Sequence, residues 1–124
     1  MSKLYHCTTN GKVCLMLNGI LRHIPNIEVY NRLFSIPFNT TVMIQYDSAS
    51  PPVPEGIPLS PHAKLIKSDN GGHIFFVDEQ GGKIVKRHIT SAEHFEQLGF
   101  DWHKIETLPS DKVNQYEWGE YCIA

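Results

Sequence analysis

Arg87-His88-Ile89 repeats the tripeptide Arg22-His23-Ile24 at a distance of 65 positions, and the match extends outward on both sides. The residues that follow at equal distances are Glu28 and Glu93, Tyr30 and Phe95, and Leu33 and Leu98. Upstream, an apolar run stands between two turn sequences in each half, at 13–17 and at 74–77. This shared order of turns, apolar runs and aromatic residues indicates that the chain is an internal duplication.

Each copy is expected to be a small α+β unit. Asn-Gly or Gly-Gly between apolar stretches predicts a β-hairpin, because both turn residues need a positive φ. Two such turns per copy predict a three-stranded antiparallel meander. Its strands are 4–8, 12–17 and 20–24 in the first copy, and 63–67, 73–78 and 84–89 in the second. A short helix and one further strand follow, the latter at 42–46 or 104–108.

The helix of the second copy carries start and stop signals. Thr90-Ser91-Ala92-Glu93 matches a capping box in which the Thr90 hydroxyl accepts from the backbone and Glu93 reaches back. Gly99 suits the left-handed position that ends a helix. In the first copy Pro25 stands in place of Thr90, and Pro37 is expected to stop the helix.

The Pro-rich stretch 51–61 predicts a stiff, extended linker between the copies. The first repeat is then 1–59, residues 60–62 end the linker, and the second repeat is 63–124. A copy of this size is marginal alone, because small domains bury too little surface. We therefore expect the two copies to pack as one pseudo-twofold domain, and the chain could also form a homodimer.

Composition excludes several classes of protein. The 124 residues include 11 Lys and Arg against 13 Asp and Glu, so no cationic surface for nucleic acid is expected. No run of about 18 apolar residues is present, so no membrane span is expected. The first residues hold no apolar signal core. A chain that begins here is expected in the cytoplasm or exported by another route, and outside the cell if it is a mature fragment.

The cysteines and histidines do not form a metal-binding pattern. Cys7, Cys14 and Cys122 are odd in number and lack CxxC spacing, so we expect reduced thiols and no zinc. Pairing of Cys7 with Cys122 stays open. A metal site from His88, His94 and His103 is disfavoured, because residues six apart do not share a helix face.

No enzyme is expected, and no cofactor. The chain lacks the GxSxG, HExxH, P-loop and Rossmann patterns. The carboxylate pairs Asp101 with Glu106 and Asp111 with Glu117 leave a small hydrolase as a weaker alternative. Solvated surface acids are the more frequent reason for such spacing.

Residues 82–102 resemble a tandem repeat of bacterial, often extracellular, proteins. In that repeat a basic step of the type KR-x-I leads into (T/P)S-x-E-x-F-x-x-x-G-F-x-W, as Lys86 through Trp102 does here. The first half matches loosely, since Pro25, Phe34 and Phe38 stand for Thr, Gly and Trp. The resemblance implies a repeat module that attaches to something, and it carries over no catalytic residue.

Two kinds of side chain are candidates for ligand binding. The duplicated pairs Arg22-His23 and Arg87-His88 end a strand before a helix, where arginine could offer a fork of donors to a sugar or carboxylate. A structural interpretation, in which the histidine positions the corner, is the more frequent one. The other candidates are polar and aromatic residues in the last quarter of the chain, namely Asp101, Trp102, Tyr116 and Trp118.

These features favour a non-enzymatic, lectin-like module that binds carbohydrate or a cell-wall glycan at two related sites. Aromatic rings would stack on the sugar, and Arg, His and Asp would bond its hydroxyls. Weak sites would gain strength from multivalency. A protein-protein interaction or assembly module, whose strand edges pair with a partner, remains the alternative.

Overall fold

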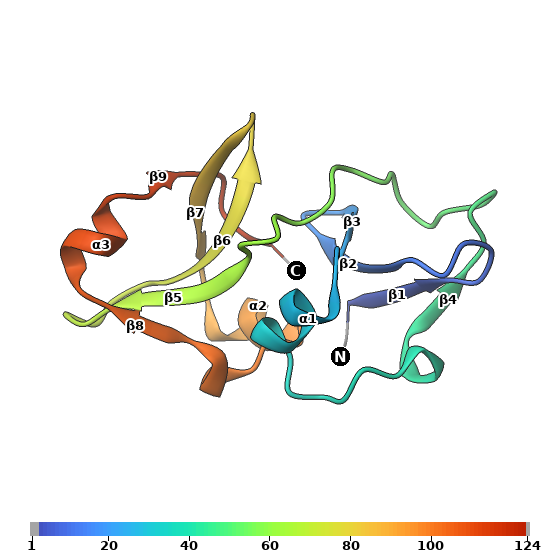
Figure 1. Ribbon diagram of the computed structural model, residues 1–124, viewed down its shortest axis with the longest axis horizontal. Coiled ribbons are helices and arrows are strands. Elements are labelled where there is room, and N and C mark those ends of the chain that lie inside the picture. The colour runs from blue at the N-terminus through green and yellow to red at the C-terminus, as the bar shows by residue number, and fades with distance from the viewer. Residues whose placement is uncertain (1–2, 124) are drawn as a thin grey trace.

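The computed structural model describes residues 3–123 as an α+β protein with two sheets and three short α-helices. The first sheet contains β1 (Leu4–Cys7), β2 (Val13–Leu17), β3 (Ile20–His23) and β4 (Ile44–Tyr46), in the spatial order β3-β2-β1-β4. The second contains β5 (Lys64–Ser68), β6 (Ile74–Gln80), β7 (Lys83–Ile89), β8 (Glu106–Leu108) and β9 (Glu117–Trp118), in the order β8-β5-β6-β7-β9. The two sheets occupy opposite ends of the molecule (Figure 1).

Both sheets share an order of pairing. The first three strands pair antiparallel in chain order, and the fourth returns parallel to the first, as β4 does beside β1 and β8 beside β5. Between the third and fourth strands lie a helix and a 3-10 turn, which are α1 (Ile27–Leu33) and η1 (Thr40–Val42), or α2 (Ala92–Gln97) and η2 (Trp102–Lys104). Two elements were not expected from the sequence, α3 (Ser110–Asn114) and β9.

The turns explain why the hairpins form where they do. Asn18 and Gly19 both have positive φ, at 53° and 72°, as a tight two-residue hairpin turn requires. Gly81 and Gly82 do the same between β6 and β7, at 59° and 77°. These turns set the register, so that Leu15 stands opposite Arg22 and Phe76 opposite Arg87.

The expected capping box is wrong by one residue. The N-cap of α2 is Ser91, whose hydroxyl accepts from the His94 backbone N–H at 3.1 Å, and Glu93 accepts from Gln97 instead of reaching back. In the first half Asn26 caps α1 by accepting from the Val29 N–H at 2.9 Å. The cap therefore falls just after Pro25 or Thr90, because a short oxygen-bearing side chain there reaches the free amides.

The helix ends differ between the halves. Gly99 has φ of 84°, which confirms the expected left-handed position after α2. The first helix ends at Leu33, with Phe34 already extended, so it stops before Pro37 is reached. Phe34 turns inward and packs beside Phe100, with ring centroids 5.6 Å apart.

The main hydrophobic core joins the two halves, and each half has a smaller cluster of its own, around Tyr5 in the first and around Ile66 in the second. The main core contains buried side chains of both sheets and both main helices, among them Leu15, Tyr30, Leu65, Phe76 and Phe95. In Figure 1 the helices α1 and α2 lie in the middle, between the sheets. Neither half could bury these side chains without the other, which agrees with the marginal size of a unit of about 60 residues.

The Pro-rich stretch is more than a linker. It runs beside β3, where the Gly56 N–H donates to the Leu21 carbonyl and the Leu59 N–H to the His23 carbonyl, both at 2.9 Å. The C-terminal stretch runs beside β7 in the same way, through the N–H groups of Gly119 and Cys122. Each stretch thus covers the edge of a third strand, which would otherwise stay open to pairing.

Within the described part of the chain, no helix has the length and apolar character needed to cross a bilayer.

Candidate functional site

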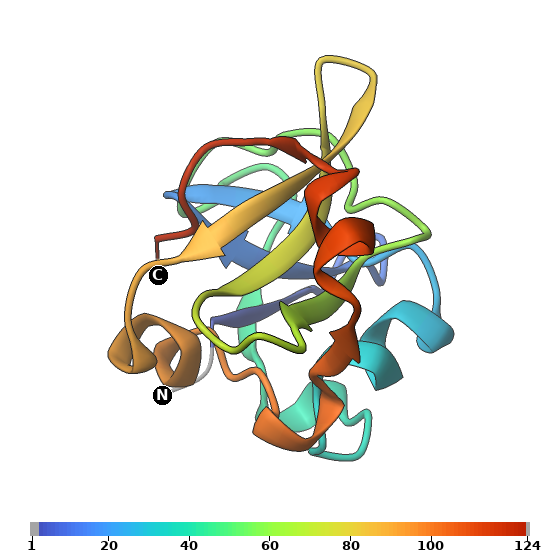
Figure 2. The ribbon, with the colours of Figure 1, turned by 90° about the vertical axis from the view of Figure 1, so that its left-hand side faces the viewer.

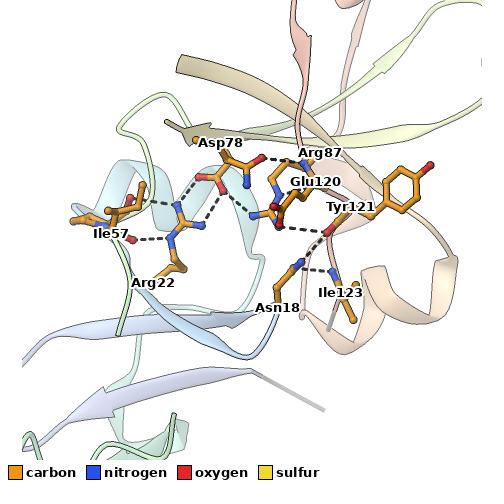
Figure 3. A network of polar contacts seen from close by, with 10 residues as sticks. Asn18, Arg22, Ile57, Asp78, Arg87, Glu120, Tyr121 and Ile123 are labelled. Atoms are coloured by element: carbon orange, nitrogen blue, oxygen red, sulfur yellow. Dashed lines mark hydrogen bonds and ion pairs between the residues drawn. The ribbon is translucent and has the colours of Figure 1, made fainter. Parts of the chain in front are cut away.

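The two predicted arginines lie inside the protein and share one carboxylate. Arg22 and Arg87 are almost fully buried and both contact Asp78 of β6, which has no exposed surface. Arg22 donates to the Asp78 carboxylate oxygens at 2.7 and 2.9 Å, and Arg87 Nη1 donates at 2.9 Å. Figure 3 shows Asp78 between the two guanidinium groups, where the halves of the chain meet.

The remaining donors of these arginines are also used internally. Arg22 donates to the carbonyls of Ile57 and Pro58, and Arg87 to those of Glu120 and Tyr121. The arginines therefore tie each edge-covering stretch to the centre of the molecule. They do not form the fork facing an external ligand that the sequence suggested, because neither guanidinium reaches the surface.

Neighbouring residues of a strand face opposite sides, so the adjacent histidines point away from this centre. His88 lies on the outer face of the second sheet, beside Phe75, its partner across the β6–β7 pairing. The ring centroids of His88 and His73 are 4.1 Å apart, and those of His88 and Phe75 are 5.8 Å apart. Trp118 meets Phe75 edge to face at 5.2 Å. Phe75 itself is buried, 5% exposed, and its ring is also 6.3 Å from that of His73, so the other three rings gather around it. We call Trp118, Phe75, His88 and His73 the aromatic row.

The side chain of Lys86 holds Trp118 of the aromatic row in place. Lys86 is buried, donates to the Val113 carbonyl at 3.0 Å, and has its ammonium 4.8 Å from the Trp118 ring centroid. Such a cation–π contact orients the indole. Trp118 nevertheless keeps 60% of its surface exposed, and Tyr121, 57% exposed, meets His88 edge to face.

The row ends at a hollow of about 270 Å³, which we call the second-half hollow. His73 and His88 line one side, Ser91 at the start of α2 lines another, and Trp102 lines a third. Trp102 stacks on Phe95 with centroids 3.9 Å apart and stays 41% exposed. A planar apolar surface thus stands beside hydroxyl and imidazole groups, which suits a small polar ring.

A smaller hollow of about 220 Å³, the first-half hollow, has a matching lining. His23, Asn26 and Phe38 stand where His88, Ser91 and Trp102 stand in the other half. Phe38 contacts the helix residue Tyr30 edge to face at 5.2 Å, whereas Trp102 stacks on the helix residue Phe95. The row itself is not repeated, because Cys14 stands opposite His23 where Phe75 stands opposite His88.

The other predicted residues lie near these surfaces but serve the fold. Asp101 caps η2 by accepting from the His103 backbone N–H at 3.0 Å, a bond that holds the pKa of its carboxyl below the usual range. A general acid needs a raised pKa instead. Tyr116 lies apart from the row, in a groove beside α3.

Sequence reasoning missed His73 and Phe75, and it noted Tyr121 only as one of the aromatic residues in the last quarter of the chain. The signal for Phe75 was present, because a hairpin closed by Gly81-Gly82 places it opposite His88. His73 and Tyr121 carry no such signal, since each reaches the row through the path of a loop or of the C-terminal stretch.

Burial lowers the pKa of both duplicated histidines, and for His88 the neighbouring His73 lowers it further. The folded protein therefore binds these protons less readily than the unfolded chain. Stability should be complete above pH 6.5, the ordinary histidine value, and should fall as the pH drops below it. We expect the double variant His23→Gln/His88→Gln to lose less stability between pH 7.5 and 5.5 than the parent, as measured by urea unfolding.

His62 provides the control for this experiment, because its side chain is exposed and makes no hydrogen bond within residues 3–123. His62→Gln should keep the parent's pH dependence. If the stability of the double variant fell with pH as much as that of the parent, His23 and His88 would not be the groups responsible for the pH dependence.

All three cysteines are buried, and no disulfide joins them in the structure of residues 3–123. Burial raises the pKa of Cys14, and that of Cys122 to about 12, which keeps these thiols protonated at neutral pH. No group of three or more metal-ligating side chains converges in this part of the chain.

Comparisons with protein-family models, with curated proteins and with solved structures returned no match for this chain.

Proposed function

We propose that this protein is a non-enzymatic carbohydrate-binding module, and that the aromatic row with the second-half hollow is its main contact surface. The observation that carries the proposal is that Trp118, His88 and His73 gather around the buried Phe75, and that both histidines line the hollow together with Trp102. The exposed indoles suit a ligand with several flat apolar faces, and an oligosaccharide has this character.

The chemistry of the surface supports this ligand class. The C–H face of a pyranose can pack on the exposed indole of Trp118 or Trp102, which both offer a large rigid area. The imidazoles of His73 and His88 and the hydroxyl of Ser91 can bond hydroxyl groups at the ring edge. The lowered pKa of His88 favours the neutral imidazole, which both donates and accepts.

We further propose that the two halves arose by duplication and that the first-half hollow is a weaker, related site. Its support is the equivalent placement of His23, Asn26 and Phe38. Two weak sites on one chain would act together on a polymeric ligand, since the second contact is intramolecular.

The proposal predicts the effect of removing the most exposed ring. Trp118→Ala should lower the affinity for an oligosaccharide by about tenfold, because exposed Trp side chains often dominate such contacts. A glycan array would identify an oligosaccharide that binds, and NMR titration would measure its affinity for the parent and the variant. Ile57→Ala, which removes a similarly exposed apolar side chain away from the row, should leave the affinity unchanged.

The absence of binding to any glycan on the array would contradict the proposal, as would equal affinities of Trp118→Ala and the parent. An effect of Trp118→Ala on stability is checked separately by its thermal unfolding, so that a folding defect is not read as lost binding.

A second candidate function, assembly with another protein, has its own observation. β4 is an edge strand, and four large apolar side chains are exposed in it and in the segment that leads to it: Ile36, Phe38, Val42 and Ile44. Exposed apolar side chains at a strand edge favour pairing with another chain. A stable dimer in light scattering, together with no glycan binding, would favour this candidate.

A further inference from the structure

A large cavity lies away from the aromatic row, under residues 109–118, which we call the C-terminal arm. It has a volume of about 880 Å³ and opens between α3 and the outer ends of β5 and β7. Figure 2 faces this side and shows α3 crossing in front of the second sheet. We call this cavity the lysine groove. The residues that matter for its chemistry are Lys64, Lys83, Ile84, Leu108, Lys112 and Tyr116.

The floor of the groove is apolar. Leu108 and Tyr116 pack against the small core beneath the arm, and Ile84 is 38% exposed at the outer end of β7. Pro109 adds a further apolar surface where the arm turns into α3. A volume of this size and an apolar lining are typical of cavities that hold small molecules.

The rim of the groove is cationic. Three lysines surround it, and an adjoining hollow that shares Lys64 and Tyr116 adds Arg32. Lys64 and Lys83 have carboxylate partners, Glu106 and Glu117, each at 3.6 Å; the Lys83 pair is largely exposed, and the Lys64 side chain is 29% exposed. Lys112 has no ion pair within residues 3–123. Four cations against two carboxylates give this region a positive charge, although the whole chain carries −2.

Exposed ion pairs at such distances are weak and exchange readily with other partners. A ligand anion can therefore recruit Lys64 or Lys83 as well as Lys112. An apolar floor with a lysine rim is complementary to a molecule that has an apolar body and one negative head.

We propose that the lysine groove binds a small amphipathic carboxylate. The aliphatic or aromatic body lies against Ile84, Leu108 and Tyr116, and the carboxylate faces Lys112 with Lys83 or Lys64 beside it. This site is independent of the aromatic row and does not require the protein to bind carbohydrate.

Decanoate is the probe for this proposal. In NMR titrations of the full chain, decanoate should shift the amide signals of Ile84, Leu108, Lys112 and Tyr116 in a saturable manner. Two matched probes separate the contribution of the alkyl chain from that of the carboxylate. Decanol has the same alkyl chain without the charge, and acetate has the carboxylate without the long chain. Decanol should bind at least about fivefold more weakly than decanoate, and acetate should not bind.

The variant Lys83→Gln/Lys112→Gln should weaken decanoate binding by about fivefold and leave decanol binding unchanged. Lys104→Gln is the control, because Lys104 is an exposed lysine outside the groove. Equal binding of decanol and decanoate, signal shifts away from the groove, or no saturable binding of decanoate would each overturn the proposal.

Discussion

Replacing Asp78 by asparagine should lower the free energy of unfolding by about 3–5 kcal/mol, because it leaves two buried guanidinium groups without a counter-charge. Asp78 is completely buried and accepts from Arg22 and Arg87. The amide of asparagine has nearly the same shape, but it is neutral and one of its atoms becomes a donor facing donors. The measurement is urea unfolding of the parent and the variant at pH 7.

Glu79→Gln is the matched control for this substitution. It makes the same chemical change one residue further along β6, where the side chain is partly exposed and has no ion pair in the described residues. Its effect should stay within about 0.5 kcal/mol. A small effect of Asp78→Asn, similar to that of the control, would show that water or another group compensates the arginines.

Phe76→Ala should be comparably destabilising, by about 3–5 kcal/mol, because it opens a cavity in a fully buried position. Phe76 stacks on Phe100 with centroids 5.5 Å apart and belongs to the core shared by both halves. Since each half completes the core of the other, unfolding should remain one cooperative transition in which both sheets are lost together. Near-UV and far-UV circular dichroism would be compared during denaturation.

Val42→Ala is the control, since Val42 is 68% exposed and its truncation creates no cavity. Its effect should lie within about 0.5 kcal/mol. Separate transitions for the near-UV and far-UV signals of Phe76→Ala would mean that the halves fold independently, contrary to the core that they share.

Local features of the fold were predictable because short-range chemistry determines them. Asn18-Gly19 and Gly81-Gly82 adopt the positive φ values that their residue types favour, and the hairpins follow. Gly99 ends α2 as expected. The capping residue was missed by one position, because Thr90 and Ser91 are both good caps and only the path of the chain selects Ser91.

The candidate site was less predictable. His88 and Trp102 were singled out from the repeat and from composition, and they line one hollow. Phe75 was not singled out, since an aromatic residue in a strand is usually a core residue, and Phe75 is indeed buried beneath the rings around it. His73 lies in the loop before β6, where no sequence pattern marks it. The arginines were interpreted as donors to a ligand, because sequence spacing does not show which carboxylate they contact. That carboxylate belongs to Asp78, which is 56 positions from Arg22 and 9 from Arg87.

The sequence by itself determined the α+β class, the hairpin turns and the end of α2, because these depend on the φ preferences, caps and apolar spacing of neighbouring residues. Only the tertiary structure decided what the repeated Arg-His pairs do. In each pair the arginine and the histidine point to opposite faces of their strand. The residue on the face that packs against the other half is buried, and the residue next to it points outward. Both arginines turn inward to one carboxylate where the sheets meet, and the half-buried histidines therefore face the other way, each into the hollow of its own half.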